Sequence, residues 1–166
     1  MKPESSISTK KGFSLLELIV TIGAIGIVVL SIAQLSQIFL RIARLTSERI
    51  EAAFLLQESA EALRFLRDDS WHDNIDTITT GTPHYLLFSS GAYSMTTTEQ
   101  PLIGGKFDRI IMLSDVFRDA TTDDIVQTDG VLSTSTKRIE IAISWRQVNA
   151  TSTETIELFL SDIFDN

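Results

Sequence analysis

The sequence predicts an α+β protein in which one long N-terminal helix packs on an antiparallel sheet of about four strands. The helix is expected to be apolar in its first half and amphipathic in its second. No proline or glycine interrupts the chain between Gly26 and Gly81, which favours one continuous helix. Beyond residue 75, apolar and polar residues alternate in short runs bounded by turn formers, as in strands with one covered face.

The apolar half of the helix is expected at residues 13–35. Residues 18–40 contain no Asp, Glu, Lys or Arg, and about 20 apolar residues suffice to cross the hydrocarbon core of a bilayer. The run exceeds the apolar stretch of a cleaved secretory signal, and no Ala-x-Ala site follows it. The segment is therefore predicted to be a membrane anchor.

Basic residues flank this segment on both sides. Those that precede it are Lys2, Lys10 and Lys11. They place the N-terminal end in the cytoplasm by the positive-inside rule, with the bulk of the chain outside. The basic residues that follow the segment weaken this charge asymmetry; they are Arg41, Arg44 and Arg49.

The amphipathic half of the helix is expected at residues 36–68. Its apolar residues recur at helical spacing: Ile38, Ile42, Leu45, Ala52, Leu56, Leu63 and Leu66. A coiled-coil seam is the alternative, but Arg49 and Ser59 interrupt the heptads. The turn-forming sequence DDSWHDN is predicted to end the helix, with Trp71 covering the edge of the core.

The remainder, residues 69–166, is predicted to be a globular β-rich head. Its expected strands are 85–90, 108–113, 138–146 and 155–164. The third alternates most clearly, with Ile139, Ile141, Ile143 and Trp145 on one face. The amphipathic half of the helix is expected to cover that face.

Composition excludes several kinds of site. The chain has 166 residues, a formal net charge of -8 and no cysteine, which removes disulfides, thiol nucleophiles and Cys-ligated metals. Neither His72 nor His84 has the partner spacing of a metal site, so we expect no metal there. The sequence also shows no phosphate-binding loop, zinc motif or interpretable Ser-His-Asp spacing, so we expect no enzyme and no cofactor. The acidic region 115–130 lacks EF-hand spacing; a solvated turn is favoured there, with calcium binding as the alternative. The acidic charge argues against a nucleic-acid partner.

One short stretch, KKGFSLLELIV at residues 10–20, carries a family resemblance. It resembles the N-terminus of type IV prepilins and the related pseudopilins, in which a basic leader ends in glycine before phenylalanine. The resemblance implies a leader at residues 1–12, cleavage by prepilin peptidase between Gly12 and Phe13, and N-methylation of Phe13. It also implies that Glu17, then the fifth mature residue, acts in subunit assembly.

The physical account of Glu17 agrees with this role. A carboxylate in hydrocarbon is costly and is usually functional. The new α-amine of Phe13 on one subunit could be neutralised by Glu17 of a neighbour, and a buried charge is tolerated when it is paired. The alternative is an interfacial glutamate whose carboxylate reaches the headgroups.

The resemblance implies a structural subunit, of the minor class, in a type IV pilus-like filament. The expected partners are prepilin peptidase, other pilin subunits, the inner-membrane assembly platform and, before assembly, membrane lipid. The chain would cross the cytoplasmic membrane once, with its head outside, and then enter a cell-surface or periplasm-spanning filament. Two alternatives stay open: a pseudopilin of a type II secretion or DNA-uptake system, and a membrane-tethered binding domain that does not assemble.

Overall fold

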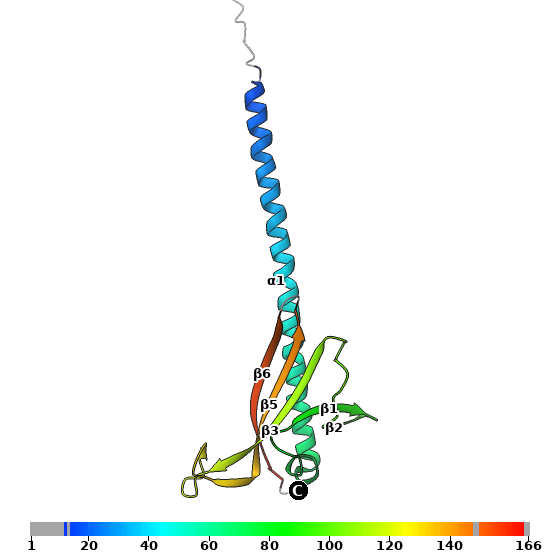
Figure 1. The fold of residues 1–166 in the computed structure, drawn as a ribbon, viewed down its shortest axis with the longest axis vertical. Helices are drawn as coiled ribbons and strands as arrows, with labels where there is room; N and C mark the ends of the chain where they lie inside the picture. Colours follow the sequence, from blue (N-terminus) through cyan, green and yellow to red (C-terminus); the bar gives the residue numbers. More distant parts are fainter. Residues whose placement is uncertain (1–11, 13, 148–149, 165–166) are drawn as a thin grey trace, which may run out of the picture. The chain divides into compact units, whose positions relative to one another are not determined.

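The computed structural model describes residues 12, 14–147 and 150–164 (Figure 1). The chain divides into two compact units, Met1–Thr46 and Ser47–Asn166. The predicted leader and Phe13 lie outside the described residues, whereas Gly12 and Glu17 lie within them.

The predicted long helix is present as α1, Leu15–Asp69. Its bounds lie within two residues of those expected from the sequence, because nothing between Gly26 and Gly81 breaks a helix. A short π-helix, His72–Asp76, follows. The Asn74 side-chain amide donates hydrogen bonds to the Leu66 carbonyl at 3.0 Å and to the Asp69 carboxylate at 3.2 Å, which satisfies part of the helix C-terminus.

The second unit contains an antiparallel sheet with the path β2-β1-β3-β5-β6. Its strands are β1 (Pro83–Ser89), β2 (Ala92–Thr96), β3 (Phe107–Arg118), β4 (Ile125–Val126), β5 (Val131–Arg146) and β6 (Thr151–Ser161). Strands β1 and β4 both pair with the same edge of β3. Strand β1 pairs near Met112, and β4 pairs with the end of β3 at Phe117 and Arg118. Figure 1 shows β3, β5 and β6 running side by side.

The sheet therefore has six strands rather than the expected four. Strand β2 was missed because it is short, although the Ser90-Gly91 turn before it carries the signal of a tight hairpin: both residues have positive φ, 56° and 84°. Strand β4 is only two residues long and lies inside the acidic region. Strands β3 and β5 both extend beyond a register shift between Asp115 and Phe117, a bulge that alternation does not reveal.

The core lies between the face of the sheet that the alternation predicted and the C-terminal part of α1. The register of β3 and β5 pairs Phe107 with Trp145, Ile111 with Ile141 and Leu113 with Ile139. These residues are buried together with the helix residues Ala52, Ala60, Ala62, Leu63 and Leu66. Three of these helix residues are alanines, whose small side chains allow close approach to the sheet. Trp71 is buried in the same cluster, as predicted.

Candidate assembly and membrane-spanning segment

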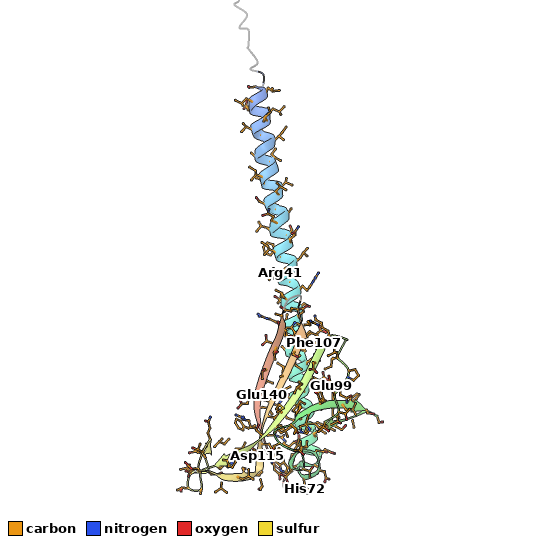
Figure 2. All side chains as sticks on the ribbon, viewed as in Figure 1. Arg41, His72, Glu99, Phe107, Asp115 and Glu140 are labelled. Carbon is orange, nitrogen blue, oxygen red and sulfur yellow. The ribbon has the colours of Figure 1, made fainter. Side chains whose placement is uncertain are left out.

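The first unit consists of an apolar helix that no other described part of the chain covers. Its large apolar side chains are exposed from Leu15 to Ile42. Among the described residues, α1 is the one helix long and apolar enough to cross a membrane, and none of its most apolar window is buried. Figure 2 shows the side chains of this segment extending outward around the helix. A helix that is apolar all round requires lipid or another protein as its surroundings.

Glu17 lies in the first turn of α1 and is exposed. It is the one carboxylate in residues 12–46, and no hydrogen bond or ion pair of its carboxylate joins it to another described residue. Its position at a helix N-terminus favours a negative charge through the helix dipole. The described chain thus offers this carboxylate no cationic partner of its own.

Three hydroxyl groups along the exposed part of α1 are satisfied within the helix. Thr21 donates a hydrogen bond to the Glu17 carbonyl at 2.7 Å, Ser31 to the Ile27 carbonyl at 2.8 Å, and Ser36 to the Ile32 carbonyl at 2.9 Å. Such bonds to the preceding turn remove the cost of placing a hydroxyl in hydrocarbon. Glu17 is the one ionisable residue in residues 13–35, and it has no such partner within the helix.

Gly23 and Gly26 have no packing role among the described residues. A Cβ built on either glycine meets no atom within 4 Å. Glycine lowers the stability of an aqueous helix by about 1 kcal/mol relative to alanine, but in membrane helices it permits close approach of a second helix. The surface at these positions is open to such a neighbour.

In the second unit, Glu48 joins α1 to the end of β5. Its carboxylate accepts hydrogen bonds from Trp145 Nε1 at 3.1 Å and Gln147 Nε2 at 3.4 Å, and Lys106 Nζ lies 3.0 Å from Oε1. The Lys106 hydrogen bond, reinforced by those from Trp145 and Gln147, lowers the pKa of Glu48 despite the opposing effect of burial. Glu48 is therefore held ionised as an anchor between helix and sheet.

A second polar contact crosses the same interface deeper in the core. Arg109 on β3 donates a hydrogen bond to the hydroxyl of the fully buried Ser59 at 3.2 Å and lies 3.7 Å from the Glu58 carboxylate. The hydroxyl of Tyr93 also donates to Glu58, at 3.2 Å. Burial lowers the pKa of Arg109 and raises that of Tyr93. The network fixes α1 against β2 and β3.

Lys137 forms a third contact, at the far end of the sheet. It is buried, and its ammonium lies 2.9 Å from Asp115 Oδ1 and 3.9 Å from Asp76 Oδ1. Thr80 donates a further hydrogen bond to Asp115, at 3.3 Å. One lysine thus holds together two carboxylates from the π-helix and β3.

The helix face that points away from the sheet is also partly apolar. Ile50 and Phe54 are exposed on it, Phe54 at 67%. Phe65 is exposed too, but it borders a hollow that Phe88 and Tyr93 of the β1–β2 hairpin also line. Such a helix face is ordinarily polar when it only meets solvent. This surface lies on the second unit and hence outside the predicted membrane segment.

The candidate metal ligands have structural roles. The Asp119 carboxylate accepts the backbone N–H groups of Thr121 and Thr122 at 2.7 and 2.9 Å, and these bonds lower its pKa. That arrangement is the side-chain-capped turn favoured from the sequence. His84 is buried, and its Nε2 lies 2.8 Å from the Thr79 carbonyl. Within the ranges that the structure describes, no group of three or more His, Asp or Glu side chains is placed to hold a metal ion.

The sequence thus singled out the apolar segment and Glu17, but it missed the contacts of Glu48, Arg109 and Lys137. The alternation in 108–113 did offer one signal, because Arg109 shares the face of Ile111 and Leu113. Comparison with known proteins adds no relative: no family model, curated protein or solved structure matches this chain.

Proposed function

We propose that this chain is a structural, minor-class subunit of a type IV pilus-like filament that assembles through its N-terminal helix. The observation that carries the proposal is the position of Glu17, which lies in the first turn of an exposed apolar helix without a described cationic partner. It follows the sequence Lys-Lys-Gly-Phe, where cleavage after Gly12 would create a free amine on Phe13. The amine of one subunit and the carboxylate of the next would then neutralise each other in an apolar surrounding.

Prepilin peptidase, the inner-membrane assembly platform and other pilin subunits are the partners that this function requires. Before assembly the same helix would lie in the cytoplasmic membrane, with residues 69–166 outside. The filament could equally belong to a type II secretion or DNA-uptake system, and the genes beside this one would distinguish these systems.

A membrane-tethered binding domain that does not assemble is the competing function. The exposed apolar residues Ile50 and Phe54 suit either function, because a partner bound by a tethered domain would also cover them. In a filament, the same residues would be covered by neighbouring subunits.

The test is cleavage. The chain is expressed with active prepilin peptidase, with an inactive peptidase variant and without peptidase, and its N-terminus is read by mass spectrometry. We expect a product that begins at methylated Phe13 with the active enzyme alone. Retention of residues 1–12 in all three samples would refute the proposal and favour the tethered domain.

A further inference from the structure

A polar stripe marks the C-terminal end of the apolar segment. It consists of Gln34, Gln37, Arg41 and Arg44, whose spacing of three, four and three residues places them on one face of α1. All four side chains are exposed, and Arg41 projects away from the helix in Figure 2. The same turns carry exposed apolar residues elsewhere on their surface: Leu35, Ile38, Phe39 and Ile42.

The two arginines have no acidic partner in their own unit. Glu17, the one carboxylate in residues 12–46, lies at the other end of the segment. Glu48, one turn beyond Arg44, is already engaged by Lys106 and Trp145. Two guanidinium groups are therefore held on one helix face without a described anion.

The position of the stripe along the helix indicates which anion it meets. At 1.5 Å per residue, Gln34 lies about 25 Å and Arg41 about 36 Å along the axis from Glu17. The hydrocarbon core of a bilayer is about 30 Å thick. If Glu17 marks one edge of the core, the glutamine amides lie at the other edge and the guanidinium groups lie among the headgroups.

We propose that the polar stripe binds the phosphate groups of anionic phospholipids at the outer face of the membrane. Guanidinium groups bind phosphate with paired hydrogen bonds, and the two amides can donate to phosphate or ester oxygens. The apolar residues around the stripe would lie against the acyl chains, as in interfacial amphipathic helices. A second copy in the same register would instead bring like charges together, which is unfavourable.

This binding would fix the depth of the helix in the membrane before assembly. It requires only that α1 crosses the bilayer, so it goes beyond the proposed filament function and does not depend on cleavage.

The test uses the full-length chain, expressed without peptidase and placed in bilayers of phosphatidylcholine mixed with phosphatidylglycerol. Lipids retained by the protein are counted by native mass spectrometry. We expect wild type to retain phosphatidylglycerol preferentially, and Arg41→Gln/Arg44→Gln to lower that preference by on the order of ten- to thirty-fold, since each basic residue near an anionic surface contributes about 1 kcal/mol. Arg41→Lys/Arg44→Lys should keep most of the preference.

The matched control is Arg64→Gln/Arg138→Gln, which removes the same charge from exposed positions on α1 and β5 that lie farther from the stripe, and it should leave the preference unchanged. Equal preference in wild type and Arg41→Gln/Arg44→Gln would overturn the proposal. A second copy of the chain as the occupant is tested with Leu40→Cys, since the chain has no other cysteine that could form a disulfide. If Leu40→Cys forms a disulfide-linked dimer that is lost when Arg41→Gln/Arg44→Gln is added, while the preference for phosphatidylglycerol remains, the stripe binds a second copy and the proposal is wrong.

Discussion

The indole Nε1–H of Trp145 donates a hydrogen bond to Glu48 at 3.1 Å, which joins the end of β5 to α1 across 97 residues of sequence. Lys106 pairs with the other oxygen of the same carboxylate. The helix and the sheet are thus joined where the second unit begins.

This contact predicts a dependence of stability on pH. The pKa of Glu48 is lowered in the folded chain from its ordinary value of 4.5. Its contribution to folding is therefore fully present above that value and is lost as the pH falls through the lowered folded pKa. We expect the urea midpoint, followed by tryptophan fluorescence in neutral detergent, to fall below pH 4.5 less steeply in Glu48→Gln than in wild type. Glu140→Gln, on the outward face of β5 (Figure 2), is the control and should follow the wild-type profile.

Lys137→Met should destabilise the second unit by about 1.5–3 kcal/mol, the range for hydrogen bonds to charged groups. The change removes the cation that lies between Asp115 and Asp76 and leaves both carboxylates without it. The measurement is the free energy of unfolding by denaturant. Arg138→Met, at the adjacent exposed position, should change it by less than about 0.5 kcal/mol. Equal effects of the two substitutions would show that the lysine does not hold this corner together.

Glu17→Ala and Glu17→Gln should leave cleavage after Gly12 largely intact but lower incorporation into filaments by about 100-fold or more. Removing one partner of a buried pair costs roughly 3–5 kcal/mol because the remaining amine stays unpaired. Incorporation is measured by immunoblotting of sheared filaments. Thr21→Ala, which removes only an internal hydrogen bond to the Glu17 carbonyl, is the control. Wild-type incorporation of Glu17→Ala would rule out the charge pair.

Phe54→Gln should reduce incorporation by about ten-fold or more while changing the free energy of unfolding by no more than about 0.5 kcal/mol. The side chain is exposed in the single chain, so its burial becomes favourable only against a neighbour, at about 1.5–3 kcal/mol for a fully buried aromatic ring. The control is Phe159→Gln, which removes an exposed phenylalanine from β6 and tests whether losing apolar surface elsewhere lowers incorporation equally. Normal incorporation of Phe54→Gln would exclude this helix face from the assembly contact.

Local patterns were sufficient to predict the helix and the central strand. The absence of helix breakers defined α1, and the alternation of Ile139, Ile141, Ile143 and Trp145 correctly gave the buried face of β5. The helical periodicity did not show how far along α1 the sheet covers the apolar stripe. Ile38 and Ile42 continue the predicted apolar stripe, yet both are exposed, because the buried helix residues begin only at Ala52.

The polar contacts were not predictable in the same way. A charged residue in a strand is ordinarily expected to face water. The alternation places Arg109 on the buried face, but only the folded chain shows that its partners there are Ser59 and Glu58 of the helix. Lys137 and Glu48 likewise depend on partners far away in sequence, and only the folded arrangement brings them together. For Glu17 the limit is different, because its proposed partner lies in another subunit.

The order of synthesis gives the helix–sheet interface a further consequence. The ribosome releases α1 first, but β5 and β6, which complete the sheet, come last. Until then, the inner helix residues Ala52, Leu63 and Leu66 have nothing to pack against. Contacts this distant in sequence form slowly, since the intervening chain must first be ordered. The apolar helix face at these residues therefore stays uncovered until β3 and β5 have been synthesised.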